Sequence, residues 1–264
     1  MAIRIAINGA AGRMGQRLLA LASADPQLKV AAALEHAAHP RLGDDAGPLG
    51  GSGPLGVKLG STLAEPVDVV IDFSVPKGTA AIVPMCVEKM VPLVVATTGL
   101  PAEVQQMIRQ AAATIPILWA PSMSLAVNVA MKLSEVAATA LKDHASGADV
   151  EIIERHHRFK EDAPSGTALK FGEIIAGVMG LTEARHGRSG RPGERPHGEI
   201  GYHAVRTGDN PGEHTIIFGL LGETLEITVR ASNRDCYAHG ALAAAKFLAA
   251  KPPGLYNMQD VLSL

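Results

Sequence analysis

The chain has 264 residues, of which 47% are hydrophobic, and this is enough for one large domain or two modest ones. Its formal net charge of −2, with neutral histidines, gives no support to nucleic-acid binding or to an anionic membrane as partner. Cys86 and Cys236 lie far apart and form no CxxC pair, which argues against a disulfide framework or a zinc site. No apolar run reaches the ~18 residues of a transmembrane helix. Because the N-terminal residues also lack the apolar segment of a signal peptide, we expect a cytoplasmic protein.

The first 35 residues are typical of the βαβ unit that opens a dinucleotide-binding fold. A strand, a glycine turn, a helix, a second strand and an acid are expected, in order, at residues 3–7, 9–15, 16–24, 28–34 and Glu35. A glycine turn lets the backbone approach a pyrophosphate, and the acid can accept hydrogen bonds from ribose hydroxyls. The alternative is a purely structural turn, because the spacing GxxGxxG differs from the common GxGxxG.

Two basic side chains near this unit bear on the choice of nucleotide. Arg13 lies inside the glycine turn, where it could neutralise a phosphate or remain a solvated surface charge. His36 follows Glu35, where it could help to tolerate a 2′-phosphate or be an ordinary surface histidine. Glu35 favours NADH, whereas Arg13 and His36 leave NADPH open.

Strands and helices continue to alternate up to residue 120, which predicts a Rossmann-like, doubly wound parallel sheet. A loop is expected over 40–60, strands over 67–73, 92–97 and 115–120, and helices over 79–89 and 102–113. Ligands of such sheets bind outside the carboxyl ends of the strands. The residues there that could contact a nicotinamide and its ribose, or simply form ordinary loops, are Phe73, Ser74, Val75, Pro76, Ala96, Thr97, Thr98, Gly99, Ala120, Pro121, Ser122 and Met123.

The pattern changes after residue 124 and predicts a C-terminal α+β domain with a mixed or antiparallel sheet. Helices are expected over 127–144 and 168–179, and strands over 150–154, 200–206, 214–221 and 224–231. Residues 186–198 are polar and basic, as in a loop or lid. We expect a dinucleotide-binding domain over 1–124 and a second domain over 125–236, with a C-terminal helix over 237–264 that packs back on the first domain.

The most informative segment runs from residue 154 to residue 167. Its side chains His156, His157 and Lys160 suit acid–base chemistry, since imidazole exchanges protons near neutral pH and an ammonium can neutralise a carboxylate or protonate an anion. A solvated basic loop is one alternative. A metal site is another, although no HExxH motif or cysteine cluster supports it.

A helix start closes this segment. Ser165 is a candidate N-cap, and Gly166 and Thr167 can offer N–H and O–H groups to a carboxylate. The segment therefore combines groups that exchange protons with groups that bind an anion.

These residues carry a family resemblance that covers essentially the whole chain. The chain resembles the dihydrodipicolinate reductases (4-hydroxy-tetrahydrodipicolinate reductases) of the diaminopimelate route to lysine. The motifs that carry the resemblance are EIIERHHRFK at 151–160, DAPSGTA at 162–168, GAAGRMG at 9–15, IDFS at 71–74, ATTG at 96–99, APSMSLAVNV from 120 and GEHT at 212–215.

The resemblance implies an NAD(P)H-dependent reductase that uses NADH, NADPH or both, without a metal. It implies that His156 donates and accepts a proton and that Lys160 donates one, while His157, Ser165, Gly166 and Thr167 bind the carboxylates of a cyclic dicarboxylate. It also implies a homotetramer built through the C-terminal domain. The cofactor contacts that it implies are Gly9, Ala10, Ala11, Gly12, Arg13, Met14, Glu35, His36, Ala96, Thr97, Thr98, Ala120, Pro121, Ser122 and Met123.

Two positions depart from the family pattern. His36 stands where a cation is frequent, which weakens the expectation of strong NADPH use, and Phe159 stands where histidine is frequent. Two other functions are compatible with the glycine turn: a different Rossmann dehydrogenase, and a non-catalytic NAD(P) sensor. Neither would need His156, Lys160 and the 165–167 helix start together.

Overall fold

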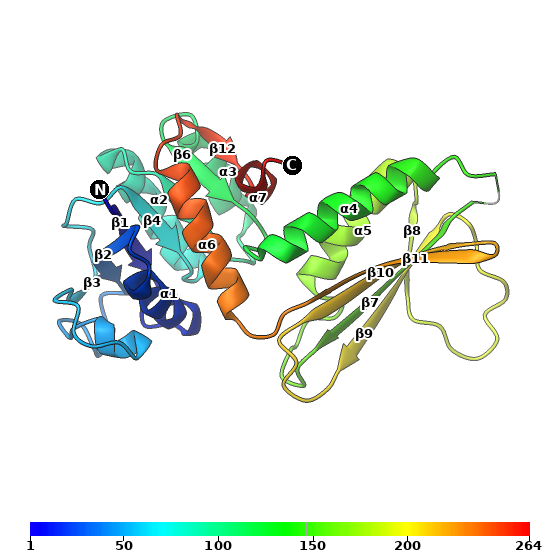
Figure 1. The fold of residues 1–264 in the computed structure, drawn as a ribbon, viewed down its shortest axis with the longest axis horizontal. Helices are drawn as coiled ribbons and strands as arrows, with labels where there is room; N and C mark the ends of the chain where they lie inside the picture. Colours follow the sequence, from blue (N-terminus) through cyan, green and yellow to red (C-terminus); the bar gives the residue numbers. More distant parts are fainter. Residues whose placement is uncertain (146) are drawn as a thin grey trace. The chain divides into compact units, whose positions relative to one another are not determined.

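The computed structural model describes residues 1–145 and 147–264, which fold into two compact units (Figure 1). The first unit contains residues 1–125 and 234–264, and the second contains residues 126–233. Within the described residues, every helix is too short or too polar to cross a bilayer.

A parallel sheet of seven strands forms the centre of the first unit, in the order β12-β6-β5-β4-β1-β2-β3. Each neighbouring pair of strands runs parallel, which confirms the predicted Rossmann-like fold. The strands are β1 (Ile3–Asn8), β2 (Leu28–Leu34), β3 (Leu59–Gly60), β4 (Val69–Asp72), β5 (Leu93–Val95), β6 (Pro116–Trp119) and β12 (Gly254–Tyr256).

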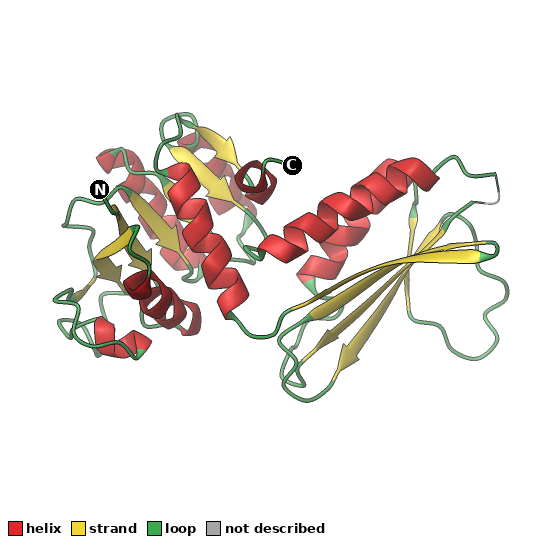
Figure 2. Ribbon diagram, viewed as in Figure 1, coloured by secondary structure: helices red, strands yellow, loops and turns green. Residues whose placement is uncertain are grey.

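Helices cover both faces of this sheet (Figure 2). Alternate residues of a strand point to opposite faces, so Ile5 and Ile7 pack on one apolar layer while Ala6 packs on the other. The helices are α1 (Arg13–Ala24) and α6 (Asp235–Leu248) on the first face, α2 (Pro76–Lys89) and α3 (Ala102–Ala111) on the second, and the short α7 (Met258–Leu262) beside α6.

Several elements of this unit differ from their predicted bounds. Helix α1 begins at Arg13 rather than at residue 16, so the last glycine of the turn lies inside the helix. The segment 237–264, expected as one helix, contains most of α6, followed by β12 and α7. Prolines at 252 and 253 explain the break, because proline has no N–H to donate to a helix.

The second unit contains a mixed sheet of five strands in the order β11-β10-β7-β9-β8. Strand β10 runs antiparallel to β7 and β11, whereas β9 runs parallel to β7 and β8. The mixed sheet confirms the predicted fold class of this half, although β8 was not predicted. The strands are β7 (Asp149–His156), β8 (Glu183–His186), β9 (Glu199–Arg206), β10 (Glu213–Leu220) and β11 (Glu223–Arg230).

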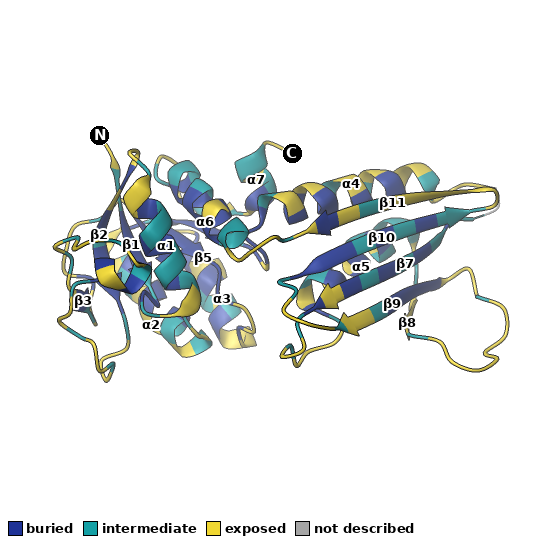
Figure 3. Cartoon of the chain, turned by 60° about the horizontal axis from the view of Figure 1, so that its bottom comes forward, coloured by how far each residue is buried: buried dark blue, intermediate teal, exposed yellow. Residues whose placement is uncertain are grey.

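Two helices, α4 (Leu125–Leu141) and α5 (Gly166–Met179), pack on one face of this sheet. Buried side chains such as Ile152, Phe171 and Phe218 form the core between them. The connection from β8 to β9 is exposed along most of its length (Figure 3).

The close packing of α1 on the glycine turn predicts opposite effects for two glycine-to-alanine changes. A Cβ at Gly15 would lie 2.1 Å from the carbonyl oxygen of Gly9 and 2.6 Å from the Cα of Ala10, and these backbone atoms cannot easily move. We expect Gly15→Ala to lower the free energy of unfolding by about 1–3 kcal/mol. The matched control is Gly177→Ala in α5, where no described atom lies within 4 Å of the new Cβ.

Alanine normally stabilises a helix interior relative to glycine by about 0.5–1 kcal/mol, so Gly177→Ala should raise the free energy of unfolding by that amount. Urea denaturation of both variants measures the difference. Equal changes in the free energy of unfolding for the two substitutions would show that the close contact between the turn and α1 does not limit the size of the residue at position 15.

Candidate functional site

A pocket of about 940 Å³ lies at the carboxyl ends of the first unit's strands. Most of the expected cofactor contacts lie in its wall: Gly9, Gly12, Arg13, Met14, Glu35, His36, Ala96, Thr97 and Thr98. The wall also contains Phe73, Ser74 and Val75, which follow a strand where a ligand was expected, and residues to which the sequence analysis gave no role, among them Asn8, Ser61 and Lys77. The described lining does not include Ala10, Ala11 or the 120–123 stretch, of which Ala120, Ser122 and Met123 are buried and Pro121 is exposed.

The glycine turn has the geometry that a phosphate needs. Gly9 has φ +81°, and a Cβ there would lie 2.7 Å from the carbonyl oxygen of Phe73. Helix α1 starts after Gly12 without a side-chain cap, so its first N–H groups remain available to an anion. Arg13 and Lys77 add positive charge to the same wall.

Glu35 is held against the turn by backbone donors. Its Oε1 accepts a hydrogen bond from the N–H of Ala11 at 3.2 Å, and its Oε2 accepts one from the N–H of His36 at 3.2 Å. The carboxylate thus lies beside the glycine turn, where ribose hydroxyls of a dinucleotide would reach it. Together, the turn, the acid and the pocket volume suit a dinucleotide.

Asp72, at the end of β4, is a fully buried carboxylate that joins several strand ends. Its Oδ1 accepts from Asn8 Nδ2 at 2.8 Å and from Ser74 Oγ at 2.5 Å. Its Oδ2 accepts from Thr79 Oγ1 at 2.6 Å and from Thr97 Oγ1 at 3.0 Å. The hydroxyl of Thr97, a candidate cofactor contact, is therefore oriented by Asp72, which the sequence showed only as an acid at the end of an apolar strand.

The expected proton-exchanging residues lie in the second unit. His156 is the last residue of β7 and is buried, whereas His157 follows the strand and is half-buried. The Nδ1 of His157 is buried and has no hydrogen-bond partner among the described residues. The Nζ of Lys160 donates to both carboxylate oxygens of Asp162, at 2.7 and 2.9 Å.

A buried carboxylate that the sequence analysis did not single out organises this region. The Oε2 of Glu154 lies 2.5 Å from His156 Nδ1 and accepts from Arg206 Nη1 at 2.8 Å. Its Oε1 accepts from Arg206 Nη2 at 2.7 Å and from the N–H of Ser165 at 3.0 Å. Burial by itself would raise the pKa of Glu154, but the hydrogen bonds from Arg206 and His156 outweigh it and hold the pKa below its usual value.

Ser165 caps α5 and connects it to a second buried histidine. Its Oγ accepts from the N–H of Ala168 at 3.1 Å and lies 3.0 Å from His214 Nε2. Burial, followed by the nearby His156, lowers the pKa of His214 to about 4. Because the Ser165 hydroxyl is engaged within the protein, the exposed Gly166 and half-buried Thr167 are the groups at the helix start that remain accessible to an anion.

The charges around His156 decide which form of the ring is available. Burial lowers the pKa of His156 and the cations Lys160 and Arg206 lower it further, whereas the hydrogen bond to Glu154 opposes them. The net shift is downward, so the ring is neutral at pH 7 before an anion binds. An imidazole, an ammonium and a helix N-terminus in one segment can bind an anion and exchange a proton with it. The described part of the chain has no group of three or more His, Cys, Asp or Glu side chains that could hold a metal.

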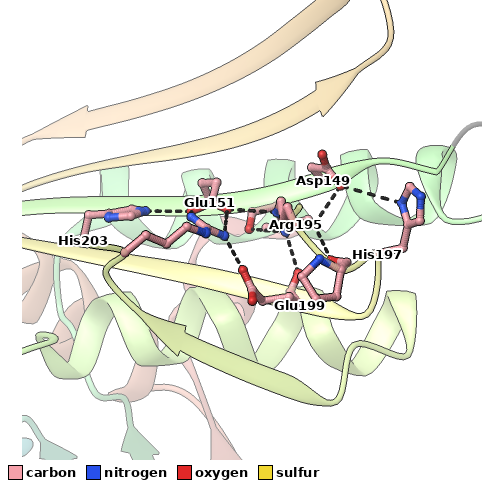
Figure 4. Close-up of polar contacts among 9 residues, drawn as sticks. Asp149, Glu151, Arg195, His197, Glu199 and His203 are labelled. Carbon is pink, nitrogen blue, oxygen red and sulfur yellow. Dashed lines mark hydrogen bonds and ion pairs between the residues drawn. The ribbon is translucent and has the colours of Figure 1, made fainter. Parts of the chain in front are cut away.

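A second polar cluster fixes the connection from β8 to β9, residues 187–198, to the sheet. Arg195 donates to the Oε1 of Glu151 at 3.0 Å and to the carbonyl oxygen of Glu199 at 2.6 Å (Figure 4). Arg188 donates to both oxygens of Glu151, at 2.7 and 3.1 Å, and pairs with the Glu199 carboxylate. Burial would raise the pKa of Glu151, but hydrogen bonds from the arginines and from a histidine of β9 lower it to about 2.

Family models match nearly all of the chain. The model described as "Dihydrodipicolinate reductase, N-terminus" matches residues 3–123, and the model described as "Dihydrodipicolinate reductase, C-terminus" matches residues 126–262.

Whole-chain relatives agree with these matches. The 4-hydroxy-tetrahydrodipicolinate reductase of Rhodopirellula baltica is 56% identical over 99% of this chain and 96% of its own, and that of Nitrosomonas eutropha is 46% identical over 99% and 98%. Among solved structures, the dipicolinate-bound dihydrodipicolinate reductase from Paenisporosarcina sp. TG-14 superposes with a TM-score of 0.77 at 25% identity, over 98% of this chain and 99% of that one.

The buried His214 predicts a specific loss of stability in mild acid. The unfolded chain protonates this side chain near pH 6.5, whereas the folded protein does so only at about 4. Between these values the unfolded state binds more protons, so the free energy of unfolding falls as pH falls, by up to about 1.4 kcal/mol per pH unit from this group. His214→Asn should remove that slope in urea titrations from pH 7 to 4. The control His197→Asn, at a side chain 81% exposed, should keep it; identical slopes in both variants would contradict the prediction.

Proposed function

The chain belongs to the dihydrodipicolinate reductase family, and from this premise we propose how its residues carry out the NAD(P)H-dependent reduction of 4-hydroxy-tetrahydrodipicolinate. The product, tetrahydrodipicolinate, lies on the route to diaminopimelate and lysine. Overall, the substrate loses water and gains a hydride and a proton. One observation supports the proposed roles. A single segment of the second unit contains His156, Lys160 and the start of α5, where Gly166 and Thr167 are accessible.

The first unit binds the nucleotide in this proposal. The N–H groups at the start of α1 would hold the pyrophosphate, Glu35 would accept hydrogen bonds from the adenosine ribose, and Thr97 and Thr98 would border the nicotinamide. When bound, the reduced nicotinamide supplies the hydride. The 120–123 stretch, which lies outside the described pocket wall, remains a proposed contact that the resemblance alone supports.

The second unit binds and protonates the substrate. The N–H groups of Gly166 and Thr167 and the unpartnered nitrogen of His157 would bind its carboxylates, while Ser165 keeps the start of α5 in place. Hydride addition leaves an enamine, to which His156 or Lys160 delivers a proton. The dipicolinate bound to the Paenisporosarcina relative is a cyclic dicarboxylate and supports a ligand of this class.

We further propose that the chain functions in the cytoplasm as a homotetramer assembled through the second unit. The face of its sheet opposite α4 and α5 carries the half-buried Ile153 and Ile217 and the exposed Val205. The same face also carries polar and charged side chains, among them Glu151, Arg155 and Thr215, so a second copy packed there would meet both apolar and polar groups.

Replacing the proton-exchanging residues tests their roles. We expect His156→Gln and Lys160→Ala each to lower the rate of NAD(P)H oxidation with the tetrahydrodipicolinate substrate by about 10²–10⁴-fold, the usual contribution of a general acid. His197→Gln and Lys170→Ala are matched controls on exposed or partly exposed side chains and should keep the normal rate. Wild-type kcat and KM in both test variants would show that the site is assigned wrongly.

Glu35 should decide between the two nucleotides, and we propose that NADH is favoured although NADPH is accepted. Glu35→Ala removes an acceptor for the ribose hydroxyls, so kcat/KM for NADH should fall by about 10–100-fold, the equivalent of about 1.4–2.8 kcal/mol from a charged hydrogen bond. The same variant should not lose activity with NADPH, because the carboxylate that repels a 2′-phosphate is gone. Initial rates with each nucleotide measure both effects; an equal loss with both would mean that Glu35 only braces the turn through Ala11.

A further inference from the structure

One buried carboxylate contacts both the proposed proton-exchanging histidine and the proposed carboxylate-binding helix start. Glu154 accepts hydrogen bonds from the Nδ1 of His156, from the N–H of Ser165 and from both terminal nitrogens of Arg206. We propose that Glu154 and Arg206 are positioning residues, which hold His156 in one tautomer and one orientation and couple it to the start of α5. This inference rests on the proposed role of His156 in proton transfer.

The tautomer follows from the donor inventory. An ionised carboxylate can only accept hydrogen bonds, so the close contact with Glu154 requires that His156 Nδ1 carries a hydrogen. Arg206 keeps Glu154 ionised by pairing with both of its oxygens, and the Glu154 side chain is 0% exposed. The Nε2 of His156 is consequently the nitrogen that gains and loses a proton during reaction.

The protonation of the His156 ring depends on charged and titratable groups from several elements. The groups that face His156 are Glu154 on its own strand, Lys160 on the following loop, Arg206 on β9 and His214 on β10. Arg206 and His156 share the single negative charge of Glu154. Removing the carboxylate must therefore make the ring harder to protonate, whereas removing the guanidinium must make it easier.

The same arginine holds the loop that follows His156. Arg206 Nη2 donates to the carbonyl oxygen of Asp162 at 2.6 Å, and the N–H of Thr207 donates to the carbonyl oxygen of His156 at 2.9 Å. At the end of this loop, the N–H of Ser165 returns to Glu154. A movement of the helix start on anion binding is thus transmitted to Glu154 and from there to the ring.

A purely structural role is the alternative. Buried ion pairs are common without any part in chemistry, and breaking one destabilises the protein because a charge is left uncompensated. In that case Glu154→Gln and Arg206→Gln would alter stability alone. If both residues tune His156, the two substitutions must shift its titration in opposite directions.

The test combines NMR and kinetics on the full-length protein. The pKa and tautomer of His156 are measured with ¹⁵N-labelled histidine, with His156→Gln identifying the signal. In Glu154→Gln we expect the pKa of His156 to fall, Nδ1 to lose its hydrogen to Nε2, and kcat/KM to fall at least tenfold without a change in NADH affinity. In Arg206→Gln we expect the pKa of His156 to rise. Glu173→Gln, which breaks the partly exposed pair with Lys170, is the control and should change none of these quantities.

Each outcome decides between the proposals. Opposite pKa shifts in the two variants support the positioning role. Shifts of the same sign, or no shifts, overturn it. It is also overturned if His156→Gln slows the reaction while Glu154→Gln keeps the wild-type rate and pH profile. A wild-type rate in His156→Gln overturns the proposed role of His156 itself. If Glu154→Gln does not fold, Glu154→Asp restores the charge at a shorter reach, and it must retain the Nδ1–H tautomer and part of the activity for the inference to stand.

Discussion

The second unit depends on the burial of the Glu154 carboxylate. A charge removed from water destabilises the fold unless it is paired and its oxygens are fully hydrogen-bonded. Here the required donors come from β9, from β7 itself and from the start of α5, through Arg206, His156 and the N–H of Ser165. These elements must therefore adopt one arrangement, and the arrangement places a histidine, a lysine-bearing loop and a helix N-terminus together. In the proposed mechanism, the proton exchange at His156 depends on how this buried charge is neutralised.

The first unit solves a similar problem with neutral donors. Asp72 is as deeply buried as Glu154, but its hydrogen bonds come from an amide and from hydroxyls, with Asn8, Thr79 and Thr97 among the donors. These bonds fix the strand ends that border the nucleotide pocket. The difference suits the two proposed ligands: a carboxylate shared by an arginine and a histidine can tune the proton affinity of the histidine, whereas neutral donors around Asp72 only fix geometry.

Much of the fold and the contiguous part of the site could be predicted from sequence, because their signals are local. Apolar runs and glycines predicted five of the seven strands of the first unit and the turn at 9–15, whereas β3 and β12 were missed. The segment 154–167 contains His156, Lys160 and the helix start together. The partners of Glu154 could not be predicted, because Arg206 is 52 residues away and only the pairing of β7 with β9 brings them together. The contact of His214 with Ser165, 49 residues away, was missed for the same reason, although the motif at 212–215 had been noted. Residues 186–198 were expected to form a loop or lid, and their sequence did not show that Arg188 and Arg195 would bind to Glu151.

The central claim, that one carboxylate sets both the anion site and the histidine beside it, is tested most directly by a crystal structure of the protein with NADH and dipicolinate. The account predicts a dipicolinate carboxylate within hydrogen-bond distance of the N–H groups of Gly166 and Thr167. It also predicts that His156 Nδ1 still contacts Glu154 while Nε2 faces the ligand. A ligand bound away from the start of α5, or a His156 ring turned away from Glu154 in the complex, would contradict it.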